Sequence, residues 1–255
     1  MGLPIALQLY TVRDAMAKDF EGTLAKVAAI GFKHIEFAGL YERDPKAVRT
    51  LIDKLGLKAV SGHVGIDGTE ANIEREAALA KILGYDLIVS SPPDGWKWAE
   101  KGTVAAYTGA VRTFEKASAF AKKHGLTYCY HNHSFEFDKL EDGRRGIDIL
   151  FNDAKPPLAS ELDVYWVKHG HDDPVTWIKK LAGRVPLLHI KDMEKGEKRG
   201  FTEVGTGTVD MKAVVAAAPA AGVRYLIIEQ DSNWKNNDGI ESAKISFENF
   251  RKIAG

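Results

Sequence analysis

The sequence has little of what disulfide-stabilised, membrane-spanning or nucleic-acid-binding proteins need. Its 255 residues include one cysteine, Cys129, which excludes an internal disulfide and fits a reducing compartment. Lysine plus arginine balances aspartate plus glutamate at 35 each, so no excess of positive charge points to nucleic acid or an anionic membrane. No apolar run approaches the roughly 20 residues that a membrane helix needs. With these classes disfavoured, we expect the binding partner to be a small molecule.

The start of the chain also lacks a targeting segment. Met1–Pro4 runs directly into an apolar, strand-like stretch without a signal peptide, so we expect a cytoplasmic protein. A periplasmic protein whose signal peptide had been removed would look the same. With 45% hydrophobic and 27% charged residues, the chain is long enough for a sizeable core, and its length is typical of one barrel. We therefore expect a single domain over residues 1–255. The sequence does not decide whether the protein forms a homo-oligomer.

Short apolar runs alternate with amphipathic ones along the whole chain. This pattern predicts strands at 5–10, 34–37, 58–63, 86–90, 126–133, 158–163, 185–191 and 224–229. It predicts helices at 20–30, 45–55, 70–83, 103–124, 145–152, 174–181, 210–221 and 241–253. Eight strand–helix units with nearly continuous apolar strands favour an α/β fold, a single (β/α)8 TIM barrel.

The longest irregular segments follow the fourth, fifth, seventh and eighth strands, at 92–102, 134–143, 193–208 and 231–238. All are loops from a strand to a helix, on the face where barrel enzymes carry their active sites. Trp166, after the sixth strand, and Trp96 and Trp98, in the first of these loops, could stack on a sugar ring. Aromatic residues at a barrel rim also commonly close the core.

Polar side chains lie near the carboxyl ends of most predicted strands. Because successive strand residues point to opposite faces, Glu161 and Asp163 share one face, and His189 shares a face with Lys191. The same alternation directs the following residues into the barrel mouth: Gln8, Glu36, His63, His131 with His133, and Glu229. A buried charge costs several kcal/mol unless it is paired or bound to metal. A bound cation would explain why so many polar and ionisable side chains point into one end of the barrel.

Asp163, His189 and Glu229 are the residues we expect to hold that cation. Two carboxylates and one imidazole suit Mn²⁺, which we favour, and also Zn²⁺, Co²⁺ or Mg²⁺. Three or four protein ligands would leave positions for substrate oxygens. The alternative is an ionic cluster in which Lys191 pairs with the acids; Lys191 could also stabilise an oxyanion.

Four stretches resemble a known family: ELDVYW, RVPLLHIKD, FTEVGTGTVD and YLIIEQD. They are similar to the sugar phosphate isomerase/epimerase family of xylose-isomerase-like TIM barrels, over essentially the whole chain. The resemblance implies a Glu-Asp-His-Glu metal site, of which Asp163, His189 and Glu229 match three members. Glu229 also matches the carboxylate that abstracts a proton in the epimerases.

The chain departs from that family at the end of the fifth strand. The family's glutamate is replaced there by His131, in the run Tyr130–Glu136. Either Glu136 folds back to the metal as the fourth ligand, which we favour, or His131 coordinates directly. A His-x-His-x-x-Glu run resembles the barrel subunits of enzymes that act on 3-oxo-glycosides, in which a strand-five histidine is the base. This favours His133 as the base, followed by His131.

Together, the site and the resemblance predict a metal-dependent isomerase or epimerase of keto-sugars. It would act by α-proton abstraction and a metal-stabilised enediolate, with His133, His131 and Glu229 as the catalytic candidates. The residues expected to contact the carbohydrate are Gln8, Glu36, His63, Trp166 and Lys191. The alternatives are a lyase or deglycosidase that acts on 3-oxo-glycosides by elimination, and a non-catalytic sugar-binding barrel. A DNA-repair endonuclease of the same superfamily is disfavoured by the balanced charge.

Overall fold

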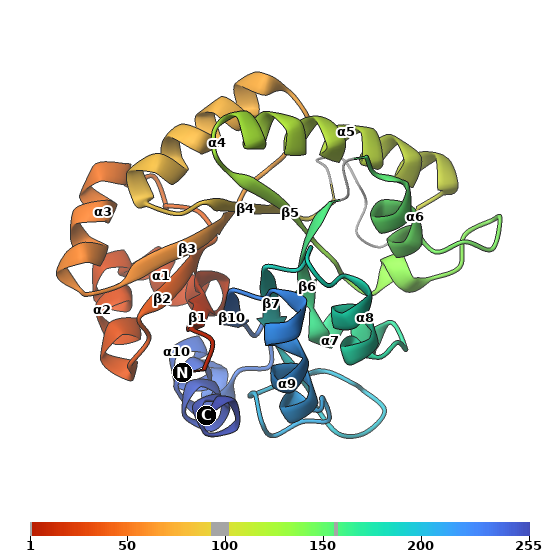
Figure 1. Ribbon diagram of the computed structural model, residues 1–255. Coiled ribbons are helices and arrows are strands. Elements are labelled where there is room, and N and C mark those ends of the chain that lie inside the picture. The colour runs from red at the N-terminus through yellow and green to blue at the C-terminus, as the bar shows by residue number, and fades with distance from the viewer. Residues whose placement is uncertain (1, 93–101, 156–157) are drawn as a thin grey trace.

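Parallel strands close into a barrel with helices around its outside (Figure 1). The structure is a computed structural model, which describes residues 2–92, 102–155 and 158–255. Neighbouring strands follow the order β1-β10-β7-β6-β5-β4-β3-β2. The barrel strands are β1 (Ile5–Gln8), β2 (His34–Phe37), β3 (Lys58–His63), β4 (Leu87–Ser90), β5 (Thr127–His131), β6 (Ala159–Asp163), β7 (Leu187–Ile190) and β10 (Tyr225–Ile228). The predicted TIM barrel of class α/β is confirmed.

The helices lie between successive strands and cover the outer face of the barrel (Figure 1). The α-helices are α1 (Arg13–Lys18), α2 (Phe20–Ile30), α3 (Pro45–Lys54), α4 (Glu70–Leu83), α5 (Val104–Lys123), α6 (Gly146–Asp153), α7 (Val164–His169), α8 (Pro174–Lys180), α9 (Met211–Ala221) and α10 (Gly239–Ala254). The 3-10 helices are η1 (Leu9–Val12), η2 (Phe135–Phe137) and η3 (Lys235–Asn237). None of the helices in the described part of the chain combines the length and the hydropathy that a membrane-spanning segment requires.

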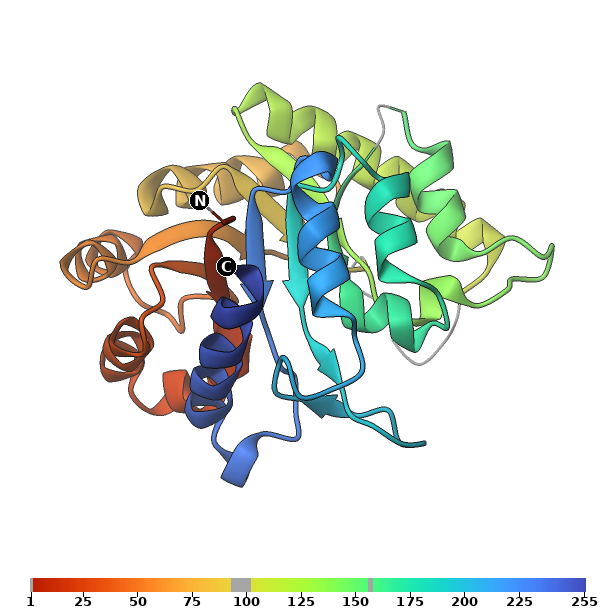
Figure 2. The same ribbon diagram turned by 60° about the horizontal axis from the view of Figure 1, so that its bottom comes forward.

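The structure differs from the expected pattern mainly directly after strands. The first strand was expected to reach Tyr10, but β1 ends at Gln8, where η1 and then α1 begin. The fifth strand was expected to reach His133 and ends at His131. A short hairpin of β8 (Asp192–Met193) and β9 (Phe201–Thr202) occupies part of the seventh loop. The segment between these two strands projects from the barrel (Figure 2). The prediction of a loop at 92–102, with Trp96 and Trp98, falls largely outside the described residues.

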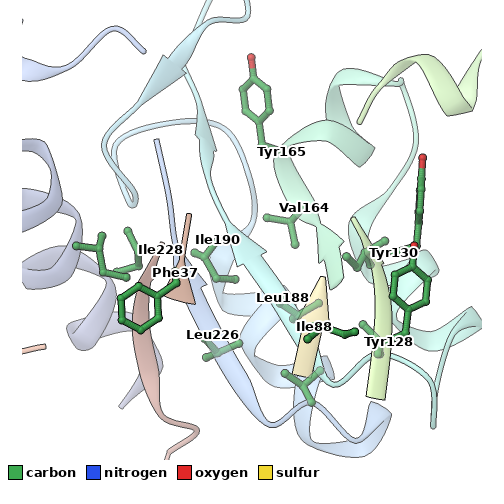
Figure 3. Packing of buried hydrophobic residues seen from close by; sticks show 14 of the residues in the cluster. Phe37, Ile88, Tyr128, Tyr130, Val164, Tyr165, Leu188, Ile190, Leu226 and Ile228 are labelled. Carbon is green, nitrogen blue, oxygen red and sulfur yellow. The ribbon is translucent and has the colours of Figure 1, made fainter. Parts of the chain in front are cut away.

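Two apolar layers hold the barrel together. The inner layer fills the barrel below the site with Ala6, Val60, Leu87, Val89, Cys129, Leu187 and Ile227. The outer layer lies between strands and helices, and Figure 3 shows Leu188 and Ile190 of β7 beside Leu226 and Ile228 of β10. Because parallel strands are covered on both faces, both sets of alternating residues are apolar. Near the carboxyl ends of the strands the inner set turns polar.

Candidate functional site

Two groups of ionisable side chains lie inside the barrel, near the carboxyl ends of the strands. Asp163, His189 and Glu229 form the group that we call the upper group. His63, His131, Glu161 and His189 form the lower group. Glu161 precedes Asp163 by two residues on the same face of β6, so its carboxylate lies one layer deeper in the barrel.

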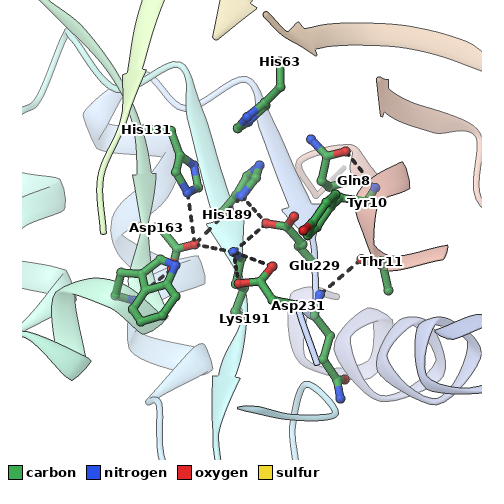
Figure 4. Close-up of polar contacts among 12 residues, drawn as sticks. Gln8, Tyr10, Thr11, His63, His131, Asp163, His189, Lys191, Glu229 and Asp231 are labelled. Carbon is green, nitrogen blue, oxygen red and sulfur yellow. Dashed lines mark hydrogen bonds and ion pairs between the residues drawn. The ribbon is translucent and has the colours of Figure 1, made fainter. Parts of the chain in front are cut away.

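The upper group brings together three of the four residues predicted as metal ligands, Asp163, His189 and Glu229 (Figure 4). Their potential ligand atoms all lie within 4.8 Å of one another. Nδ1 of His189 is 2.8 Å from Oε2 of Glu229 and 3.9 Å from Oδ2 of Asp163. Parallel pairing of β6 with β7 sets Asp163 directly beside His189, which explains why residues distant in sequence meet. All three side chains are buried.

Asp163 is oriented by the helix that starts immediately after it. Its Oδ1 accepts a hydrogen bond from the backbone N of Trp166 at 2.9 Å, as the N-cap of α7. Its own backbone N donates to Oδ1 of Asn132 at 3.0 Å. Because Oδ1 is engaged by the helix, Oδ2 is the oxygen that faces His189 and Lys191.

Lys191 places a buried positive charge against the upper group. Its Nζ lies 2.6 Å from Oε2 of Glu229, 3.1 Å from Oδ2 of Asp163 and 3.0 Å from Oδ2 of Asp231. Burial alone would lower the pKa of Lys191, but Asp163, Asp231 and Glu229 raise it well above its usual value. Burial alone would likewise raise the pKa of Glu229, yet Lys191 and His189 bring it well below the ordinary range. Glu229 is therefore an ionised, paired carboxylate.

In the lower group, three imidazole nitrogens converge on one carboxylate oxygen. Oε2 of Glu161 lies 2.7 Å from Nε2 of His63, 2.9 Å from Nδ1 of His131 and 3.1 Å from Nε2 of His189. His189 contacts both groups, since its two ring nitrogens face opposite layers. Glu161 was not predicted as a site residue. Its alternation with Asp163 along β6 is the sequence signal that could have identified it.

Glu36 lies beside the lower group and was expected to contact substrate. Instead it is fully buried. Its Oε1 accepts from Nε2 of Gln8 at 2.5 Å and lies 2.8 Å from Nε2 of His189, and its Oε2 accepts from the hydroxyl of Ser61. Glu36 thus orients the ring of His189. Gln8 both supports Glu36 and lines the cavity described below.

Glu136, the favoured fourth ligand, does not fold back toward the upper group. Its Oε1 accepts a hydrogen bond from the hydroxyl of Tyr130 at 2.8 Å, and both oxygens accept from the backbone N of His133, at 3.0 and 2.9 Å. The carboxylate therefore closes the turn after β5 instead of facing the cation position. Burial raises the pKa of Glu136 to about 7. Of the two candidates, His131 lies nearer the upper group, with Nε2 3.7 Å from Oδ2 of Asp163.

A cavity of about 550 Å³ opens over both groups. It is lined by several of the predicted site residues, namely His63, His131, His133, Lys191 and Glu229 together with Gln8. Trp166 is not among the described residues that line it; its ring packs against the rings of His133 and Phe201, at centroid distances of 5.4 and 5.5 Å. Burial, followed by the charge of Lys191, holds the pKa of His133 well below its usual value. His133 therefore presents a neutral imidazole at neutral pH.

Fold and site together define a TIM barrel with ionisable residues gathered at the carboxyl ends of its strands. The chain belongs to the xylose isomerase-like TIM barrel family, whose model matches residues 24–253. An inosose dehydratase of Mesomycoplasma hyopneumoniae strain 7448 is 21% identical over 270 residues, covering 92% of this chain and 88% of that protein.

Solved structures show the same fold. A sugar phosphate isomerase/epimerase from Parabacteroides distasonis superposes with a TM-score of 0.86 at 21% identity, covering 100% of both chains. An IolI protein with a bound zinc atom superposes with a TM-score of 0.74 at 13% identity, over 99% of this chain and 98% of that one. At these identities the structural similarity establishes the fold and does not identify the reaction.

Proposed function

We propose that the protein is a metal-dependent enzyme that removes the proton next to the ketone of a keto-sugar or related cyclic polyol. This step is shared by isomerases, epimerases and lyases. The observation that carries the proposal is that Glu229 of the upper group, Lys191 and His133 line one cavity. Relatives named as sugar isomerases and inosose dehydratases support the same class of substrate.

The upper group fits a divalent cation. Oδ2 of Asp163 and Nδ1 of His189 are buried and have no hydrogen-bond partner among the described residues, although they approach other polar atoms closely. Atoms placed in this way suit metal ligands better than hydrogen-bonding partners. A bound ion, with Mn²⁺ favoured over Zn²⁺, Co²⁺ or Mg²⁺, would supply Lewis acidity toward the substrate's carbonyl and adjacent hydroxyl. The zinc in the IolI structure supports metal binding in this family.

His133 is the residue we assign as the base. Its ring lines the cavity, and its lowered pKa keeps the imidazole unprotonated at neutral pH. His131, the second candidate, is buried and engages Glu161 through Nδ1. Glu229 is held by Lys191 and His189, so its carboxylate is a weaker base than an imidazole. Lys191 faces the same cavity and would stabilise the negative charge that develops on the substrate oxygen.

Elimination is the outcome that the site favours after proton abstraction. Epimerisation needs a second acid or base on the opposite face of the substrate, and Glu229, which serves in that role in the epimerases, is tied into ion pairs. Loss of a β-hydroxyl as water can use a single base, which takes the α-proton and returns it to the leaving oxygen, together with one stabilised oxyanion. The inosose dehydratase relatives agree with this outcome. Epimerisation or isomerisation by reprotonation is the second candidate.

Proton exchange tests the proposal directly. Protein loaded with Mn²⁺ is incubated with ketoses, inososes and 3-oxo-glycosides in D₂O, and products are analysed by NMR and by the ultraviolet absorbance of an enone. We expect enone formation with at least one substrate, or deuterium at the carbon next to its ketone. Failure of every compound to exchange or eliminate, while at least one binds, would favour a non-catalytic sugar-binding barrel.

Replacing Glu136 with glutamine separates a structural role from metal ligation. Glu136→Gln should lower Mn²⁺ affinity by less than about tenfold, because its oxygens bond to Tyr130 and His133. Asp163→Asn, the matched variant in the upper group, should weaken binding by more than about 100-fold, since it removes a ligand. Isothermal titration calorimetry measures both. Equal losses in the two variants would restore Glu136 as a ligand.

A further inference from the structure

The lower group is a cluster of metal-ligating residues, and the proposed reaction assigns no role to His63 or Glu161. We propose that His63, His131 and Glu161, with His189 alongside, bind a divalent transition-metal ion of their own, one layer beneath the upper group. This site is distinct from the one that Asp163 and Glu229 define. Three of its four members lie outside the upper group.

The positions of the ligand atoms suit a single ion. One atom from each of the four residues lies within 4.8 Å of every other, the spread expected around a common metal. Nε2 of His63 and Nδ1 of His131 approach the same oxygen of Glu161, at 2.7 and 2.9 Å. If His189 binds an upper ion through Nδ1, the lower group still keeps three ligands. Both sites can therefore be filled together.

Buried polar atoms also point to a ligand. Oε1 of Glu161 is buried, and no described residue gives it a hydrogen bond. Its other oxygen receives three imidazole nitrogens, more than a carboxylate oxygen needs for hydrogen bonding. An unsatisfied carboxylate oxygen next to a crowded one is costly in a buried site. A cation bound at Glu161 would relieve both conditions.

Charge balance is consistent with a divalent ion. Glu161 and Glu36 place two carboxylates in this layer, both fully buried. An ion that displaced the protons of the imidazoles would leave three neutral rings, two carboxylates and two positive charges, which sum to no net charge and suit an interior of low dielectric. Oε1 of Glu36 lies 3.3 Å from Nε2 of His63 and is itself oriented by Gln8.

The composition of the lower group selects a different metal from the upper group. Two or three imidazoles and one carboxylate suit Zn²⁺ or Co²⁺ in tetrahedral geometry, with water as the fourth ligand where His189 binds the upper ion, whereas the oxygen-rich upper group accepts Mn²⁺ or Mg²⁺. An ion can also reach the lower group from the cavity. The side chain of His63 is 25% exposed and lines the cavity, as does His131.

Metal stoichiometry tests the inference. Metal-free full-length protein is equilibrated with Zn²⁺ or Co²⁺, and bound metal is measured by elemental analysis and by the visible absorption of Co²⁺. We expect about two equivalents in the wild type and about one in each of His63→Ala and Asp163→Asn. The intense absorption of tetrahedral, nitrogen-bound Co²⁺ should persist in Asp163→Asn and disappear in His63→Ala. His124→Ala, at an exposed position at the end of α5, controls for loss of a surface histidine.

Unchanged stoichiometry and Co²⁺ absorption in His63→Ala would overturn the inference. Glu161→Gln, which keeps the shape of the side chain, gives a second reading if His63→Ala folds poorly by circular dichroism. One equivalent that is lost in His63→Ala and kept in Asp163→Asn would support the lower site and contradict the upper one. The exchange assay distinguishes the two proposals: proton exchange with only an upper ion overturns the lower site alone, and two ions without exchange overturn the reaction alone.

Discussion

His133→Gln is expected to lower the rate of α-proton exchange by about 10²–10⁴-fold, the usual contribution of a positioned general base. His133 lines the cavity and belongs to neither group of potential metal ligands. The variant should therefore bind metal like the wild type. The loss should appear in kcat more than in KM, because the imidazole acts on the reacting proton and not on substrate binding.

A matched control for this variant is His171→Gln. His171 is exposed and contacts Arg199 at 2.9 Å, away from the cavity lining. It should leave exchange within about twofold of the wild type, as expected of a surface substitution. If His133→Gln exchanged protons as fast as His171→Gln, the base would have to be another residue, with His131 and Glu229 the next to test.

The barrel could be predicted from the sequence because its signals are local. A short run that is mostly buried forms β3, and Gly84, with a φ of 86°, ends α4 after Leu83, where the helical pattern was predicted to end. Helix α7 was missed because VYWVKH, an apolar run after β6, has the composition of a continuing strand. The chain forms a helix instead, because the side chain of Asp163 accepts a hydrogen bond from the backbone N of Trp166 and caps the first turn.

For the site, the sequence predicts which side chains point into the barrel, but it does not predict which of them contact one another. Strand alternation correctly placed Asp163, His189 and Lys191 inside the barrel, and it gave Glu161 the same orientation. Which of these side chains meet depends on the stagger of the strands, which pairs His131 with Glu161 and Asp163 with His189. The periodicity of the sequence does not determine this relative shift between neighbouring strands. The position of Glu136 depends on the hydroxyl of Tyr130 and a single backbone N–H, which no motif reveals.

These pairings explain why the polar layer is stable in a barrel interior. Each buried acid has a cationic or hydrogen-bonding neighbour on another strand: Glu36 has Gln8 and Ser61, and Glu229 has Lys191. The two groups are joined through His189, whose opposite nitrogens face Glu161 and Glu229. Substitution in one group should therefore change the electrostatics of the other.

Lys191→Met should destabilise the fold by about 3–5 kcal/mol at neutral pH, the usual cost of removing one partner from a buried ion pair. Methionine fills a similar volume, so the loss reports charge more than packing. The variant leaves Asp163, Glu229 and Asp231 without the ammonium that contacts all three. Urea unfolding at a series of pH values measures the effect. Lys195→Met, at an exposed position between β8 and β9, is the control and should change stability by less than about 0.5 kcal/mol.

The deficit of Lys191→Met should shrink as the pH falls. Burial raises the pKa of Asp231 to about 6 even with Lys191 present, above the ordinary value of 3.8. An acid whose folded pKa is raised destabilises the folded state when ionised, and this penalty disappears as the pH falls through about 6 toward 3.8. Without Lys191 the pKa values of Asp231 and Asp163 should rise further, so protonation relieves the variant more than the wild type. A deficit that stayed constant between about pH 8 and pH 5 would show that Lys191 stabilises the barrel by packing and not by its charge.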